Sequence, residues 1–260
     1  VLQRYDDPET QRAYIGNPYL TDSKLLNLEA RAEYYLDNQS RISLAGFYKK
    51  IDNPIEVYIV SSANERITSF ANAPEATLFG AEADIQYVYD LADLGDAFMS
   101  KQLVLVGNYT YTNSELSVGA DDRTTIVVSN NPVPVAANQY FDDGAPLVGQ
   151  SDHLVNFQIG VEDMDVLQQF TVLFSYASER VSFRGANQLP DVIEDPGLRV
   201  DLVARQGFEL LGTESELKLQ ARNIFGRGHQ EYQINSAGLR FEANTYDVGT
   251  TISASLSVKL

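Results

Sequence analysis

The chain ends in the stretch Thr251-Ile252-Ser253-Ala254-Ser255-Leu256-Ser257-Val258-Lys259-Leu260, in which apolar and polar side chains alternate without interruption. Because successive side chains of a β-strand point to opposite sides, this segment presents one wholly apolar face and one polar face. The apolar face needs dry surroundings and the polar face needs water. A terminal strand of this kind predicts a membrane β-barrel that closes on its last residue.

Composition limits the alternatives. The 260 residues are 44% hydrophobic and include 15 Tyr and 12 Phe, which predicts a folded chain. No run of apolar residues approaches the roughly 18 to 20 that a spanning helix needs, so any membrane crossing must use strands. The sequence contains no Cys and therefore no disulfide or thiolate metal site. A net charge of −17 disfavours nucleic acid as a partner, and we interpret the acidity mainly as a source of solubility.

Alternation of the same kind recurs along the chain. In the first such segment Leu26 and Leu28 share one face, while Asn27 and Glu29 share the other. Nine long strands are predicted in all, near residues 24–36, 41–52, 77–90, 100–114, 151–161, 167–180, 198–208, 214–224 and 248–260. Their lengths of roughly 10 to 14 residues are closer to those of tilted transmembrane strands than to those of soluble sheets.

The connections between these strands are sorted by length. Short ones are predicted at 36–40, 91–99, 162–166 and 209–213, and long ones alternate with them at 53–76, 115–150, 181–197 and 225–247. Such alternation is typical of an antiparallel up-and-down transmembrane barrel, whose turns face the periplasm and whose loops face outward. Placing the carboxyl terminus in the periplasm makes every long connection extracellular.

Several motifs resemble those of TonB-dependent outer-membrane receptors. The stretch Asn72-Ala73-Pro74-Glu75-Ala76-Thr77-Leu78-Phe79-Gly80-Ala81-Glu82 is similar to the start of a late barrel strand of that family. The preceding Phe47-Tyr48-Lys49-Lys50-Ile51-Asp52-Asn53-Pro54-Ile55 also resembles the family, as does Leu219-Gln220-Ala221-Arg222-Asn223-Ile224-Phe225-Gly226-Arg227, followed by Tyr232. The motifs and the terminal strand occur in the family's order. The chain departs from the family by ending on Leu260, where Phe or Trp is usual.

The resemblance implies an active-transport receptor in the outer membrane of a Gram-negative bacterium. Such a receptor imports a scarce small-molecule nutrient, most often a ferric siderophore or a similar iron complex, with energy supplied through TonB. The implied partners are the lipid bilayer, the receptor's own plug domain, TonB and the barrel assembly machinery. Residues 1–260 are expected to form the carboxyl-terminal portion of the barrel, without a plug domain. Val1-Leu2-Gln3-Arg4 does not begin a signal peptide.

The resemblance also suggests functional side chains. The lumen-facing candidates are Glu29, Arg31, Glu33, Glu82, Asp84, Arg199, Asp201, Arg205, Lys218 and Arg222, which alternatively pair with one another within the barrel. Candidates for ligand contact in an extracellular loop are Asp121, Asp122, Arg123, Tyr140, Asp142 and Asp143. The expected carboxyl-terminal assembly signal comprises Leu256, Val258 and Leu260. Aromatic residues expected on the lipid-facing side are Tyr34, Tyr48, Tyr87, Tyr89, Tyr109, Tyr111, Phe170, Phe174 and Tyr176.

Enzymatic functions find little support. Ser151-Asp152-His153 has the residue types of a hydrolase relay, but adjacent strand residues point in opposite directions. His229 is the only other histidine, and two isolated histidines do not make a metal site. The pairs Asp121-Asp122 and Asp142-Asp143 lack the ligand spacing of a calcium loop. We therefore expect no enzyme activity, no cofactor and no resident metal.

Two other functions remain open at this point. The chain could belong to a passive porin or structural outer-membrane barrel that has no plug. It could also be a soluble β-sandwich that binds a ligand, in which case two sheets would pack face to face around the apolar residues. As an isolated nine-strand sheet, the chain is predicted to self-associate or fold on itself, because unclosed sheet edges leave backbone groups unpaired.

Overall fold

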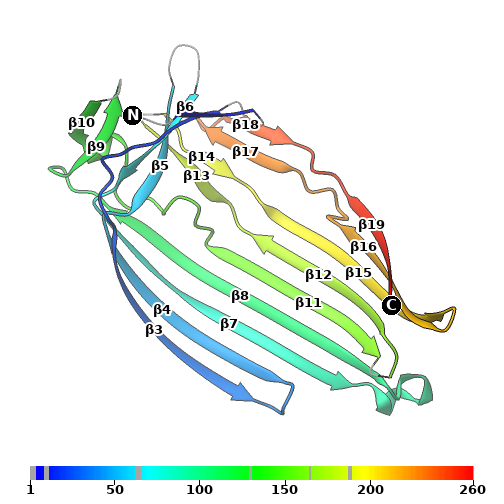
Figure 1. The fold of residues 1–260 in the computed structure, drawn as a ribbon. Helices are drawn as coiled ribbons and strands as arrows, with labels where there is room; N and C mark the ends of the chain where they lie inside the picture. The colour runs from blue at the N-terminus through cyan, green and yellow to red at the C-terminus, as the bar shows by residue number, and fades with distance from the viewer. Residues whose placement is uncertain are drawn as a thin grey trace.

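A computed structural model describes residues 4–8, 12–61, 66–128, 131–163, 165–186 and 189–259. The regular structure of these residues is almost wholly β, and their helices are three 3-10 turns. None of these helices is long and apolar enough to cross a membrane. The strands form one nine-stranded sheet, one eight-stranded sheet and a separate hairpin (Figure 1).

The nine-stranded sheet is a long antiparallel meander, which we call the wall. Its strands are β3 (Lys24–Tyr35), β4 (Arg41–Asp52), β7 (Glu75–Asp90), β8 (Lys101–Ser117), β11 (His153–Asp163), β12 (Gln168–Ala177), β15 (Gly197–Leu210), β16 (Thr213–Arg222) and β19 (Thr251–Val258). They lie side by side in the order of the sequence. The nine predicted strands are thereby confirmed, with ends that differ by up to three residues.

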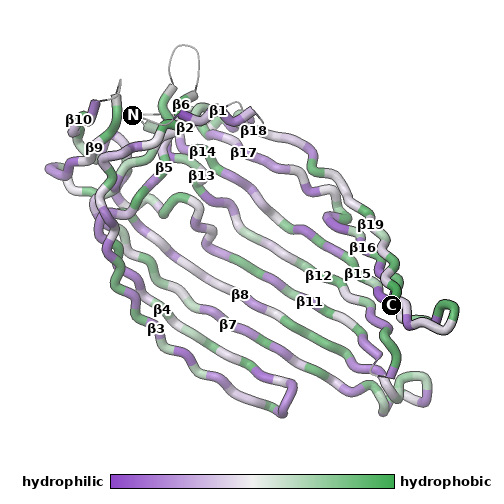
Figure 2. Tube along the Cα trace, in the orientation of Figure 1, coloured by the Kyte–Doolittle hydropathy of each residue, from purple (hydrophilic) through white to green (hydrophobic). Residues whose placement is uncertain are grey.

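The register gives the wall one apolar and one polar face. One cross-strand row on the apolar face runs from β3 to β15 through Tyr34, Ile42, Ile85, Gly107, Phe157, Phe174 and Val200. Side chains of the apolar face are open to the surroundings, as at Leu44 (61% exposed) and Phe79 (50% exposed). Figure 2 shows hydrophobic and hydrophilic residues alternating along the strands. The soluble sandwich is contradicted, because its apolar face would lie buried against a second sheet.

The wall separates short connections from long ones. The described short connections are residues 36–40, 91–100, 165–167 and 211–212, and all lie at one end, which we call the short-connection end. The long connections run through residues 53–74, 118–152, 178–196 and 223–250. Their described parts lie at the opposite end, which we call the mouth end (Figure 1). The predicted alternation of connection lengths is confirmed.

The long connections contain strands that the sequence pattern did not predict. Together with the amino-terminal segment they build the eight-stranded sheet, which we call the mouth sheet. In spatial order its strands are β1 (Arg4–Asp7), β2 (Arg12–Ile15), β6 (Arg66–Asn72), β5 (Ile55–Ser61), β13 (Arg180–Gly185), β14 (Val192–Glu194), β17 (His229–Ile234) and β18 (Arg240–Tyr246). The pairs β2–β6 and β5–β13 are parallel. Connection 118–152 adds the separate hairpin of β9 (Arg123–Val128) and β10 (Asn131–Ala136) and a 3-10 turn, η3 (Ala137–Gln139).

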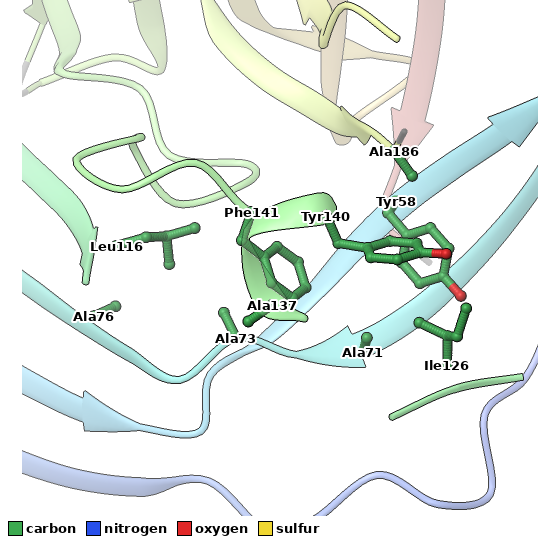
Figure 3. Close-up of a cluster of buried hydrophobic side chains, with 10 residues drawn as sticks. All are labelled: Tyr58, Ala71, Ala73, Ala76, Leu116, Ile126, Ala137, Tyr140, Phe141 and Ala186. Atoms are coloured by element: carbon green, nitrogen blue, oxygen red, sulfur yellow. The ribbon is translucent and has the colours of Figure 1, made fainter. Parts of the chain in front are cut away.

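The hydrophobic core lies at the mouth end. It forms where connection 118–152 and the β5–β6 hairpin pack on the polar side of the wall, near the ends of β7 and β8. The buried members are Tyr58, Ala71, Ala73, Ala76, Leu116, Ile126, Ala137, Tyr140, Phe141 and Ala186. Figure 3 shows Tyr140 beside Tyr58, and their ring centroids are 5.0 Å apart at 77°. Such edge-to-face packing stabilises aromatic pairs. The connection is therefore anchored inside the mouth end.

Two motif residues have clear structural roles. Gly80 lies under the ring of Phe47, and an added Cβ there would come within 2.5 Å of that ring and 2.1 Å of the Tyr111 carbonyl oxygen. Asn223 ends β16 in the left-handed region at φ 54. Its side-chain amide donates to the carbonyl oxygens of Arg227 and Gly249, and its oxygen accepts the Arg227 N–H. These contacts turn the chain out of the wall and into the last long connection.

The described wall does not close. β3 and β19 are its two edge strands, and every described residue of both is exposed. By contrast the mouth sheet folds back on itself. Arg12 of β2 forms a buried ion pair with Glu231 of β17, although four strands separate these strands in the sheet order. The Arg12 guanidinium also lies 4.4 Å from the ring centroid of Phe183 on β13.

Candidate functional site: the polar face and the mouth

A continuous polar row crosses the wall at mid-height. By register it joins seven strands through Glu33, Ser43, Asp84, Asn108, Asn156, Ser175 and Arg199. Asp84 is the centre of its first half, because it accepts hydrogen bonds from Arg31 (3.2 Å), Ser43 (3.0 Å) and Asn108 (2.9 Å). Hydrogen bonds to a carboxylate stabilise its ionised form. A fixed negative charge therefore sits on this face.

A second polar row lies nearer the short-connection end. It runs from β8 to β16 through Gln102, Glu162, Gln169, Arg205 and Lys218. Arg205 pairs with Glu216 at 2.8 Å and faces Gln169 across the strand. Charges of both signs therefore lie along the polar face, where some of them pair across strands.

All ten predicted lumen-facing residues lie on this polar face. Four of them are engaged by described neighbours: Arg31 with Glu33 and Asp84, and Arg205 with Glu216. Asp201 accepts the backbone N–H of Asn223 at 2.7 Å. The other five form no side-chain hydrogen bond or ion pair with described residues; they are Glu29, Glu82, Arg199, Lys218 and Arg222. Pairing within the wall therefore accounts for only part of the set.

The mouth contains a buried ionic cluster that the sequence did not reveal. Arg184 of β13 is 2% exposed and contacts Glu56 of β5 at 3.2 Å and Asp191 at 2.9 Å. Glu56 is also 2% exposed and accepts the N–H of Val148. Burial raises the pKa of the Glu56 carboxyl above its usual range, and the nearby Arg184 charge opposes that shift. The cluster joins three long connections to one another.

A cavity of about 370 Å³ adjoins this cluster. It lies between η3 and the β13–β14 hairpin, and its lining includes Asn138, Tyr140, Asp142, Arg184 and Asp191. Two of the six loop candidates therefore face one hollow, namely Tyr140 and Asp142. Tyr140 is at the same time largely buried in the hydrophobic core.

The other loop candidates lie outside this cavity lining. Asp122 accepts the Gly119 N–H at 2.7 Å, and Asp143 accepts the Val118 N–H at 2.9 Å. These carboxylates shape the chain around β9 and β10. Asp121 and Arg123 are exposed.

The hydrolase-like triplet is not arranged as a relay. The Ser151 hydroxyl donates to the carbonyl oxygen of Ser178 at 2.9 Å. The His153 Nδ1 lies 2.9 Å from the Tyr109 hydroxyl. Among the described residues there is also no group of three His, Cys, Asp or Glu side chains placed to hold a metal ion. The arrangement of the wall is instead that of a surface with one wet and one apolar side.

Comparison with protein families gives one match. A family model described as "TonB dependent receptor-like, beta-barrel" matches residues 3–225. Searches of curated proteins and of solved structures return no match. The matched range includes eight of the nine wall strands, from β3 to β16.

Proposed function

Because the chain belongs to the TonB-dependent receptor β-barrel family, we propose that it is the carboxyl-terminal part of a barrel that imports a ferric siderophore or a similar iron complex. The family is one of outer-membrane transporters rather than enzymes. The observation that carries the proposal is the family match over a meander with one lipid-compatible face and one charged face. Energy for import would come through TonB, and the barrel would lie in the outer membrane of a Gram-negative bacterium.

The polar face has the chemistry to hold a plug domain in the lumen. Glu82 and Arg199 belong to the five charged residues without a described partner, and a closed barrel would direct them inward. Such charges are costly to leave unpaired when water is excluded. A plug carrying complementary charges would satisfy them and would be released when those pairs break.

The charge of the long connections supports a narrower proposal for the iron complex. The four long connections contain 14 Asp and Glu residues against six Lys and Arg residues, a net charge of −8. A negative field at an entrance repels anions and concentrates cations. We therefore propose a neutral or cationic complex, such as a ferric trihydroxamate, rather than an anionic ferric catecholate. Contacts from Asp121, Asp122, Arg123, Tyr140, Asp142 and Asp143 are part of this proposal.

The last strand is proposed to carry the assembly signal. Leu256 and Val258 lie exposed on the edge strand β19, where the barrel assembly machinery could bind them. Leu260 lies outside the described residues.

An uptake experiment tests the transport proposal. The complete reading frame is expressed in a Gram-negative host without its own siderophore receptors, and ⁵⁵Fe uptake is measured from ferrichrome, which is neutral, and from ferric enterobactin, which is anionic. We expect uptake of the neutral complex, lost when TonB is deleted. Uptake that persists without TonB would favour a passive porin. TonB-dependent growth on another nutrient without iron uptake would keep the transporter and reject the iron complex.

A pair of variants tests the plug contact. Glu82→Gln removes a charge from the polar face, whereas Glu115→Gln removes one from the exposed opposite side of neighbouring β8. We expect the first to lower uptake and to increase leakage of large antibiotics, and the second to leave both unchanged. Equal effects from the two variants would contradict a plug-holding role for the polar face.

A further inference from the structure

The turn between β15 and β16 has a residue that its backbone does not favour. Leu211 and Gly212 are the two central residues, with φ of 53° and 78°. Two positive φ values define a type I′ hairpin turn, for which Asn-Gly is the preferred pair. A bulky leucine is strained in the left-handed region. Its side chain is also 97% exposed, so it gains no packing within the described fold. Folding alone therefore does not explain a leucine here.

An apolar hollow lies beside this turn. It has a volume of about 500 Å³ and is lined by Val166 and Leu167 of the neighbouring connection and by Phe208 of β15. Val166 is 53% exposed. The lining also includes Glu209 and Glu214, so carboxylates border the apolar surface, although Glu214 is paired with Lys259 at 2.8 Å. A hollow of this kind accommodates apolar side chains of a partner while its border attracts positive charge.

The adjacent short connection extends the same surface. Residues 91–100 form two 3-10 turns, η1 (Ala92–Leu94) and η2 (Asp96–Phe98), which leave Leu94 and Met99 about two-thirds exposed. This connection lies next to residues 165–167, because Lys101 and Asp163 pair across β8 and β11. Figure 1 shows both this connection and the β15–β16 turn projecting at the end of the wall. Several exposed apolar residues thus gather at one end.

The short connections themselves carry only negative charge. They contain four aspartates, Asp37, Asp93, Asp96 and Asp165, and no Lys or Arg. Cations stand on the adjoining strand ends, where Lys101 pairs with Asp163 and Lys259 pairs with Glu214. Like charge repels anionic lipid headgroups, and opposite charge attracts basic peptides. Resting on the proposed function, this end would face the periplasm, because the short turns of outer-membrane barrels do so. We propose that the short-connection end is a docking surface for a basic, leucine-bearing segment of a periplasmic protein, with Leu211 as its main apolar contact.

Peptide binding tests this docking surface. The complete reading frame is placed in nanodiscs of zwitterionic lipid, and fluorescence anisotropy reports binding of a labelled peptide of alternating Lys and Leu. A peptide with Glu in place of Lys and empty nanodiscs serve as references. We expect the Lys-Leu peptide to bind with an affinity that falls as salt rises, and the Glu-Leu peptide not to bind. Equal binding of the two peptides, or no binding of either, would overturn the proposal.

Variants separate docking from a structural role. Leu211→Asn installs the residue that the turn prefers, so the hairpin should become more resistant to unfolding while peptide affinity falls about tenfold. Leu239→Asn is the matched control, because Leu239 is 65% exposed and belongs to the β17–β18 hairpin at the mouth end. It should leave peptide affinity unchanged, and equal losses from the two variants would reject the site.

A fluorescence measurement tests the bilayer as the alternative occupant. A fluorophore attached at position 213, beside an intact Leu211, is quenched by nitroxide-labelled lipid if this turn enters the headgroup region. Quenching that persists when the Lys-Leu peptide is added would assign the surface to lipid and overturn the proposal. A second outcome would also overturn the proposal: the peptide protects a fluorophore at position 239, at the mouth end, and does not protect the fluorophore beside Leu211.

Discussion

Replacing Arg184 by Met should loosen the mouth sheet strongly. The substitution keeps most of the side-chain volume but leaves Glu56, which is 2% exposed, without the guanidinium 3.2 Å away. Removing one partner of a buried ion pair typically costs about 3–5 kcal/mol. Glu56 keeps the Val148 N–H bond, and its raised pKa lets it take up a proton, so we expect the lower end, about 3 kcal/mol.

Hydrogen exchange measured by mass spectrometry is the suitable assay, with the complete receptor in nanodiscs. A loss of about 3 kcal/mol corresponds to exchange roughly 100-fold faster where opening of the sheet limits protection. The effect should be confined to peptides from β5 and β13, which pair in parallel at Arg184 and Tyr58. The wall strands should keep their protection.

Two comparisons make the result decisive. Arg240→Met is the matched control, because Arg240 is 44% exposed and its ion pair with Glu242 lies at the surface, where such pairs contribute about 0–1 kcal/mol. The double variant Glu56→Met with Arg184→Met should recover much of the lost protection, since no buried charge is left alone. Unchanged exchange in Arg184→Met, or a double variant that is worse than either single one, would refute the reasoning.

Three further predictions concern pH, packing and strand ending. Glu56 has a raised pKa in the folded state, so its contribution to stability is present below the ordinary value of 4.5 and is lost as the pH rises through the raised value. Protection of the mouth sheet from hydrogen exchange should therefore fall over that pH window. Glu56→Gln should abolish this pH dependence. Gly80→Ala should lower the temperature at which the protein unfolds in gel-shift assays, because the added methyl group forces β7 away from Tyr111 at a cost of about 1–3 kcal/mol or more. Shortening the Phe47 side chain as well should restore only part of the lost heat resistance. Asn223→Ala should destabilise the β16–β19 region by about 1 kcal/mol more than Asn223→Gly does, because glycine adopts a φ of 54° without strain. Denaturant titrations measure the difference, and the reverse order would contradict this account.

The wall could be predicted because its strands are marked by a pattern that short stretches of sequence contain. Each strand has one face toward an apolar surrounding and one toward water, so the period of two is written into the sequence. Val104 and Val106 weakened that pattern, and the structure places them on the polar face of β8 opposite Gly160 and Gln158. The strand was still recognised, because the outward residues around them kept the alternation.

The mouth sheet was not predictable for the opposite reason. β5 carries Ile55-Glu56-Val57-Tyr58-Ile59-Val60, in which apolar residues occupy both faces. Tyr58 and Val60 lie at the hydrophobic core on one side, and Ile59 is buried on the other, so no simple alternation remains to be read. Its pairing is also remote, since Glu56 and Arg184 are 128 residues apart. Nothing in a single sequence indicates that two such residues meet.

The candidate functional residues on the strands could be predicted from the sequence, whereas the placement of those in the long connection could not. The ten polar-face residues follow from strand alternation, and the structure places all ten on one face. Residues of the long connection do not follow from a rule of that kind. Tyr140 reads as an exposed loop aromatic, yet it packs against Tyr58 in the core. Whether a loop side chain is buried depends on distant contacts, which periodicity does not encode.

The two sheets differ in how far contacts within the chain stabilise them. The mouth sheet buries its ion pairs and returns on itself through Arg12 and Glu231, so it carries its own packing. The wall leaves its apolar face and both edge strands open, and in water such a surface and such edges are sites of association. Lipid satisfies the apolar face, but only further strands satisfy the backbone groups of β3 and β19. A wall of this kind therefore depends on the rest of a barrel for closure, whereas the long connections already contact one another and the amino-terminal segment through buried ion pairs within the described residues.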